Sequence, residues 1–209
     1  SNTFNSITTS VITVSTSAMF VDNAKLNIGT GSDLQLYHDG SNSYIQDTGT
    51  GGLYIEGTTV VIRNSGGTEA LAQFTPDGAV TLYYDASAKI ATTNTGAQVT
   101  GTLLATTDTD TENTGSVTLD FAANQNFILT LTGNLTLANP TTEQVGQAGV
   151  ITFIQDGTGS RTLTLGTQYK TRAGAGITLS TAANTVDVVP YFVQSSGNIL
   201  LGAVQKAFS

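Results

Sequence analysis

The chain of 209 residues contains no cysteine and no tryptophan, and it has only three prolines and one histidine. The lack of cysteine excludes disulfide frameworks, thiolate zinc sites and cysteine nucleophiles. A histidine-based metal site or catalytic triad would depend on His38 alone. Charged residues make up 11% of the chain, against roughly 25% in an average globular protein. The range of enzymatic chemistry open to this sequence is therefore narrow.

Basic residues are also scarce, with 7 Lys and Arg against 15 Asp and Glu and a net charge of −8. They are scattered along the chain, so no cluster would neutralise phosphates, and we expect no nucleic-acid partner. A polybasic anchor and an apolar run near 18 residues are both missing, so we expect no membrane insertion. The first ten residues, SNTFNSITTS, have no basic segment that would indicate a signal peptide.

Threonine and glycine are abundant, and short apolar segments recur throughout. Threonine favours strands and glycine favours turns, so the composition predicts an all-β protein. No segment has a convincing helical period of 3.6 residues. The Ala122-Ala123 and Ala182-Ala183 pairs could form at most a single helical turn.

Residues 1–22 read as an extended N-terminal arm. The segment Ser10–Thr16 is β-branched and nearly alternates apolar and hydroxyl residues, which predicts a strand. The arm is too apolar to remain free in water. We therefore expect it to anchor the chain by pairing with another chain or a partner surface.

Residues 23–105 read as a repetitive β spacer of short strands and Gly-rich turns. The segment Leu36–Ser41 (LYHDGS) is similar to Leu82–Ser87 (LYYDAS), and an isoleucine follows each of them. Small β repeats imply stacking, because one unit cannot cover its own apolar face. The strands expected here include the segments 26–28, 34–37, 44–45, 53–56 and 60–63.

Residues 106–116 (TTDTDTENTGS) read as a polar linker, and residues 117–209 as a C-terminal β domain. About eight strands separated by turns predict an antiparallel sandwich or jelly-roll-like fold. The expected strands are 117–121, 127–131, 135–137, 149–155, 161–165, 177–179, 186–194 and 198–204.

Exposed edges of short strands invite aggregation, which a monomeric spacer would not avoid. Winding three copies around one axis pairs those edges and buries alternate residues. Threonine tolerates both wet and dry strand faces, and a low charge suits identical chains in which each charge meets its own copies. These features favour an intertwined homotrimer.

Four segments carry a resemblance to a known family. Residues 28–52 and 77–101 resemble a repeat in virion structural proteins of marine tailed bacteriophages. Residues 131–140 and 153–159 resemble a β module near the ends of such proteins. The resemblance implies a tail-fibre-like or capsid-decorating protein built as a homotrimer of intertwined β chains. With only about two repeat units, a short spike or knob fits the length better than a long shaft.

Two groups of side chains could carry chemistry. His38, Asp39 and Ser41 are residue types of acid–base catalysis, but they lie within one Asp-Gly turn, and Tyr84 takes the place of His38 in the second repeat. The alternating segment Asp108–Asn113 resembles a calcium loop but lacks its glycine and its distant glutamate. A turn and a solvated linker are the favoured interpretations, with a cation on a trimer axis as the alternative for the second.

Tyrosine side chains could stack on sugar rings, although packing on half-buried strands is the favoured role. They are Tyr37, Tyr44, Tyr54, Tyr83, Tyr84, Tyr169 and Tyr191. The sequon Asn134-Leu135-Thr136 would be accidental in a protein made in bacteria. We predict no catalytic, cofactor-binding or metal-binding residues and no cofactor.

The sequence therefore predicts a non-enzymatic structural protein on the virion surface, assembled in the bacterial cytoplasm. The first hypothesis is a short trimeric tail fibre or spike involved in host attachment, which binds other virion proteins through residues 1–22 and contacts host surface glycans. The alternative is a capsid decoration protein anchored to the shell by the same arm. A carbohydrate-active enzyme is the third, although no paired carboxylates stand out.

Overall fold

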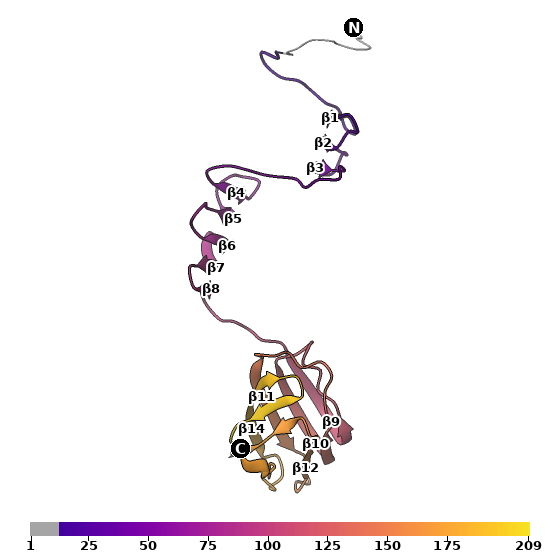
Figure 1. Cartoon of the computed structure of the whole chain (residues 1–209), viewed down its shortest axis with the longest axis vertical. Helices are drawn as coiled ribbons and strands as arrows, with labels where there is room; N and C mark the ends of the chain where they lie inside the picture. The colour runs from indigo at the N-terminus through magenta and orange to yellow at the C-terminus, as the bar shows by residue number, and fades with distance from the viewer. Residues whose placement is uncertain (1–12) are drawn as a thin grey trace. The chain divides into compact units, whose positions relative to one another are not determined.

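The computed structural model describes residues 13–209, and in that range the fold is all-β. Its one helical element there is the three-residue 3-10 turn η1 (Arg172–Gly174), so the predicted all-β class is confirmed. No helix between residues 13 and 209 has the length and hydrophobicity to cross a membrane. The chain divides into two compact units, residues 1–100 and 101–209. Figure 1 labels the elements of both.

The predicted strand at Ser10–Thr16 falls partly outside the described residues. Its described part, Thr13–Thr16, is not in a strand. The neighbouring side chains Met19, Phe20 and Val21 are exposed, at 83%, 55% and 71%. The described part of the arm thus carries apolar side chains that residues 13–209 leave largely exposed.

The N-terminal unit contains a first sheet of three antiparallel strands in the order β1-β2-β3. Alternating apolar and polar residues separated by Gly-containing turns favour such hairpins. At Gly40 the turn needs a positive φ of 96°, which glycine adopts without steric cost. The strands are β1 (Lys25–Ile28), β2 (Leu34–His38) and β3 (Ser43–Asp47).

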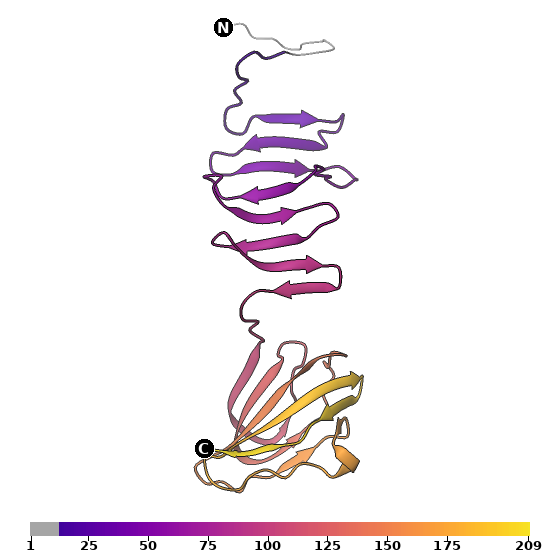
Figure 2. The same ribbon diagram turned by 90° about the vertical axis from the view of Figure 1, so that its left-hand side faces the viewer.

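A second sheet in the same unit has five strands in the sequential order β4-β5-β6-β7-β8. Every neighbouring pair is antiparallel and joined by a short turn, so the sheet is a meander, which Figure 2 shows clearly. The strands are β4 (Val60–Arg63), β5 (Ala70–Phe74), β6 (Val80–Tyr84), β7 (Ser87–Thr93) and β8 (Gly96–Val99).

The two similar sequence segments occupy equivalent hairpins. Leu36 in β2 pairs with Ile45 in β3, and Leu82 in β6 pairs with Ile90 in β7. The strand predicted at residues 53–56 is absent, however, and this prediction was wrong. The side chains of Tyr54 and Ile55 are 82% and 66% exposed. Strand propensity alone did not make a strand here, because no strand among residues 13–209 pairs with the segment.

The C-terminal unit is built on one curled eight-stranded sheet, visible in Figures 1 and 2. Its main path is β12-β10-β11-β14-β15-β13; β9 adds to β10 and β16 adds to β14. The strands are β9 (Thr107–Val117), β10 (Asn126–Leu137), β11 (Ala148–Gln155), β12 (Leu163–Leu165), β13 (Tyr169–Lys170), β14 (Val186–Ser195), β15 (Asn198–Leu201) and β16 (Gln205–Phe208).

The strand directions in this unit correct the expected antiparallel sandwich. β10 runs parallel to β9, β11 and β12, whereas β14 is antiparallel to β11, β15 and β16. The connections 118–125 and 138–147 are long enough to carry the chain back to the starting end of the sheet, which parallel pairing requires. Only the turn at Ser196-Gly197, between β14 and β15, is a tight hairpin within this sheet.

The linker predicted at residues 106–116 is also corrected, because almost all of it lies in β9. β9 pairs with β10 over nearly its whole length. The side chain of Asn113 is fully buried, and its amide donates to the carbonyl oxygens of Asp110 and Thr130 at 3.0 and 3.1 Å. Polar and acidic composition suggested a solvated linker, but threonine-rich segments are also good edge strands.

The core lies against one face of the curled sheet. Alternate residues of β10, β11, β14 and β15 supply it, as the strand period of two requires. Phe127, Leu131 and Ile151 have no exposed surface. Strands were expected at 117–121 and 177–179, but in these two ranges only Val117 lies in a strand. Their residues Leu119, Phe121 and Leu179 nevertheless join the core from connecting segments.

Candidate functional site

The His38–Ser41 segment is a hairpin turn between β2 and β3. The Asp39 carboxylate accepts hydrogen bonds from the backbone N–H groups of Asn42 and Ser41 at 2.7 and 2.8 Å. The Tyr44 hydroxyl donates to its other oxygen at 2.8 Å. These bonds, that from Asn42 foremost, lower the pKa of Asp39 to about 2. The His38 ring lies 3.1 Å from the Ser43 hydroxyl and not at Ser41, so Asp39 shapes the turn and the three residues do not form a relay.

The acidic residues of β9 do not converge. Asp108 and Asp110 lie two positions apart on the strand, so both point to one face and Thr109 between them points to the other. Across residues 13–209, no group of three or more His, Cys, Asp or Glu side chains is placed to hold a metal ion. The segment is therefore an edge strand rather than a loop wrapped around a cation.

Six of the seven tyrosines divide into three groups. Tyr37 and Tyr44 stack at 4.6 Å between ring centroids, with the Lys25 ammonium 4.3 Å above Tyr37. Tyr169 and Tyr191 are buried in the C-terminal core, where burial raises the pKa of Tyr191 to about 12. Tyr54 and Tyr84 are 82% and 75% exposed. Only the third group has a broadly accessible ring.

The Tyr191 hydroxyl holds the connection between β9 and β10 close to the strands β11 and β14. It donates to the Gln125 carbonyl at 2.6 Å. A Cβ atom at Gly149 would lie 2.1 Å from the same carbonyl oxygen. Glycine is therefore required at position 149, and we expect Gly149→Ala to displace the segment that enters β10.

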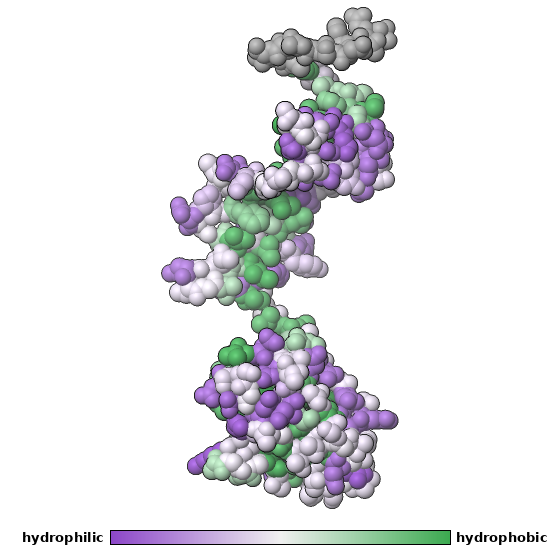
Figure 3. Space-filling model, turned by 45° about the vertical axis from the view of Figure 1, so that its right-hand side comes forward, coloured by the Kyte–Doolittle hydropathy of each residue, from purple (hydrophilic) through white to green (hydrophobic). Residues whose placement is uncertain are grey.

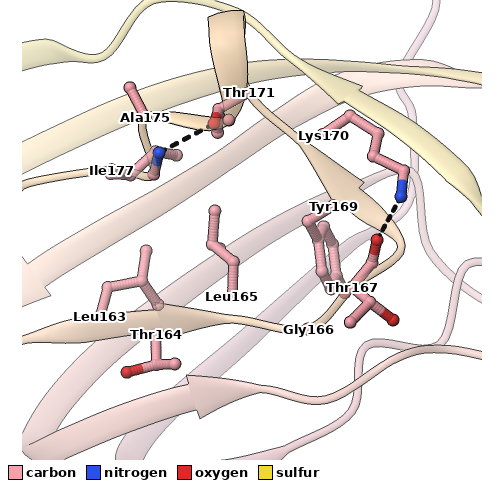
Figure 4. A pocket seen from close by; sticks show the side chains of 12 residues that line it. Leu163, Thr164, Leu165, Gly166, Thr167, Tyr169, Lys170, Thr171, Ala175 and Ile177 are labelled. Atoms are coloured by element: carbon pink, nitrogen blue, oxygen red, sulfur yellow. Dashed lines mark hydrogen bonds between the residues drawn. The ribbon is translucent and has the colours of Figure 1, made fainter.

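A pocket of about 500 Å³ opens along β12, β13 and η1 (Figure 4). Leu163 and Leu165 point into it from β12, and Ile177 closes the opposite side. The Lys170 ammonium donates to the Thr167 carbonyl. The Thr171 hydroxyl accepts from the Gly176 N–H at 2.9 Å, which holds the loop that carries Arg172. Sequence reasoning missed this pocket; the basic pair beside glycines in Lys170–Gly176 (KTRAGAG) is its local signal.

One ion pair is present among residues 13–209, between Asp156 and Arg161. The Arg161 guanidinium donates to the Asp156 carboxylate through Nη2 at 2.8 Å and through Nε at 3.2 Å. This bond, with the N–H groups of Gly159 and Thr158, lowers the pKa of Asp156 from 3.8 to about 2. The pair closes the loop between β11 and β12.

This pKa shift predicts a pH-dependent stability. A carboxylate whose pKa is lower in the folded state stabilises the fold above the unfolded value of 3.8, and this contribution is lost as the pH falls toward about 2. We expect Asp156→Asn to flatten the loss of thermal stability between pH 4 and 2, measured by calorimetry. Asp108→Asn is the control, since no hydrogen bond from residues 13–209 reaches that side chain. An unchanged profile in Asp156→Asn would contradict the prediction.

Comparison with known proteins adds an independent finding. Residues 113–198, from the middle of β9 to the first residue of β15, match the family described as "Putative phage tail fibre C-terminal domain". No curated protein and no solved structure matches the chain. The matched range includes β10, β11 and β14, which supply most of the core. The C-terminal unit is thus similar to a structural domain of phage tail fibres, and the match supports a tail-fibre-like, virion-associated protein.

Proposed function

We propose that this chain forms a short trimeric tail fibre or spike on a bacteriophage virion and contributes to host attachment. The family match to a tail fibre C-terminal domain carries the proposal, and it favours the tail over the capsid. The marine origin that the resemblance implied remains a prediction. The trimer is supported by the distribution of apolar side chains on the two sheets of the N-terminal unit.

The second sheet has one face with two uncharged apolar rows. Pairing places Ile62, Ala72, Leu82, Ile90 and Val99 side by side across all five strands. A second row consists of Val60, Phe74 and Val80. The side chains of Leu82 and Ile90 are each 43% exposed. Figure 3 shows these hydrophobic residues as a green band over the sheet.

The opposite face of the same sheet is more polar. The adjacent row contains Val61, Gln73, Thr81, Ala91 and Gln98, and the Tyr83 hydroxyl donates to Gln73 there. Exposed apolar side chains are therefore concentrated on one face of this sheet and are not spread over both. Covering the exposed half of each large apolar side chain would contribute about 1 kcal/mol.

The first sheet has the same asymmetry. Leu26, Leu36 and Ile45 form an apolar row across its three strands, and all three side chains are exposed. The other face carries a polar network, in which Lys25 donates to Gln35 at 2.7 Å and Tyr37 donates to Gln46 at 3.1 Å. Identical copies packed through uncharged apolar faces avoid the repulsion that like charges would cause.

Two measurements test the proposal. Light scattering on the full chain should give a mass near three times 21.5 kDa, and antibody labelling of intact particles should mark the tail. Removing residues 1–22 should abolish labelling of the particles while the C-terminal unit stays folded. A monomeric mass would overturn the trimer. Labels on the capsid would overturn the tail fibre in favour of a decoration protein.

A further inference from the structure

The C-terminal unit has two adjoining pockets with a common wall. The larger is the pocket of about 500 Å³ along β12 and β13, and the smaller, of about 290 Å³, lies toward the end of β15. Thr171, Ala175, Gly176 and Ile177 line both. The two pockets lie on either side of these shared residues and are together called the recess.

Charge is distributed unevenly around this recess. Residues 101–209 contain seven acidic and four basic side chains, so the unit has a net charge of 4 − 7 = −3. Lys170 lines the larger pocket and Arg172 the smaller, and no carboxylate lines either. The third cation, Arg161, is paired with Asp156. Two exposed cations therefore face a carboxylate-free recess in an otherwise acidic unit.

The remaining lining is chemically mixed. Leu163, Leu165 and Ile177 offer apolar contacts inside the larger pocket (Figure 4), and Thr167 lies at the β12–β13 turn beside Lys170. Saccharides present apolar C–H faces together with hydroxyl groups, so they suit such a surface. Sites for small ligands combine an apolar lining with a few placed polar groups in this way.

We propose that this recess binds an anionic saccharide, with Lys170 and Arg172 contacting its carboxylate or phosphate groups. The inference rests on the proposed role in host attachment and specifies the ligand class for it. Two cations suffice for one or two anionic groups on a glycan. A nucleic acid would require a longer basic surface than this unit has.

Nuclear magnetic resonance titration of the full chain tests the inference. The probes are trigalacturonate, which carries carboxylates, mannose 6-phosphate, which carries a phosphate, and neutral maltotriose. At least one anionic probe should shift the amide signals of residues 163–177, and maltotriose should not. Raising the ionic strength from about 0.01 M to about 0.15 M should weaken this binding, because salt screens exposed charges.

The variants Lys170→Gln and Arg172→Gln should each weaken anionic binding about tenfold, since each removes a charged hydrogen bond. Lys206→Gln is the matched control, because Lys206 is an exposed cation on β16 outside both pockets. The inference fails if neither anionic probe shifts these signals, if maltotriose shifts them equally, or if the two variants bind as the unaltered chain does. If the saccharide titration fails but antibodies label the tails of intact virions, the proposed function stands and only the ligand site is refuted. If antibodies do not label the virions, the proposed function fails whatever the titration shows.

Discussion

Leu82→Lys is expected to reduce the native mass of the chain from three subunits to one. Leu82 lies in the middle of the apolar row on the second sheet, between Ala72 and Ile90. In a trimer packed through this face, the substitution would bring three ammonium groups together in an apolar interface. Burying an unpaired charge costs several kcal/mol in each subunit, in addition to the apolar contact that Leu82 would no longer make.

Thr81→Lys is the matched control for this substitution. Thr81 is the preceding residue of β6, so its side chain points to the opposite, more polar face. The control should remain trimeric in light scattering, and the amide signals of residues 107–201 should stay unchanged in both variants. A trimeric Leu82→Lys chain would show that this face is not the interface.

Asp187→Ala is expected to lower the free energy of unfolding of the C-terminal unit by about 3 kcal/mol. The Asp187 side chain is 2% exposed in the apolar strand β14. It accepts hydrogen bonds from the backbone N–H and hydroxyl of Ser180, at 2.5 and 2.7 Å, and from the N–H of Ala207 at 2.9 Å. Alanine would leave these donors without an acceptor and release both the Ser180 segment and β16.

Denaturant unfolding of the full chain measures this loss. Asp187→Asn should lose less, because its amide oxygen still accepts hydrogen bonds. Asp120→Ala is the control: the exposed Asp120 carboxylate accepts one backbone bond, from Ala122 at 3.0 Å, and we expect a loss below about 1 kcal/mol. Equal losses in Asp187→Ala and Asp120→Ala would contradict the role assigned to Asp187.

Local sequence signals were sufficient for the hairpins of the N-terminal unit. Turn residues such as Asp39-Gly40, flanked by alternating apolar residues, act over a few positions, and the structure has β2 and β3 where they predict them. The same logic explains β14 and β15, which are joined by a tight turn at Ser196-Gly197. In these places pairing partners are close in sequence, so local chemistry decides the structure.

Long-range pairing determined the elements that sequence reasoning missed. The polar segment Thr107–Val117 becomes a strand because the long strand β10 offers it an edge. Leu53–Glu56 has better strand residues but gains no partner strand within the described part of the chain. The parallel pairs of β10 also join segments separated by long connections, and no local residue pattern encodes the direction of such pairs.

The sequence by itself determined the all-β class, the short hairpins and the absence of thiol chemistry, because composition and tight turns act locally. Only the tertiary structure decided which segments form the curled sheet, which buries Asp187 and places Arg172 and Leu201 around one pocket. Those outcomes depend on contacts between residues far apart in the chain. Each such contact contributes to stability only after the entropy cost of ordering the intervening chain has been offset. Whether it forms therefore depends on the whole fold and not on a local segment.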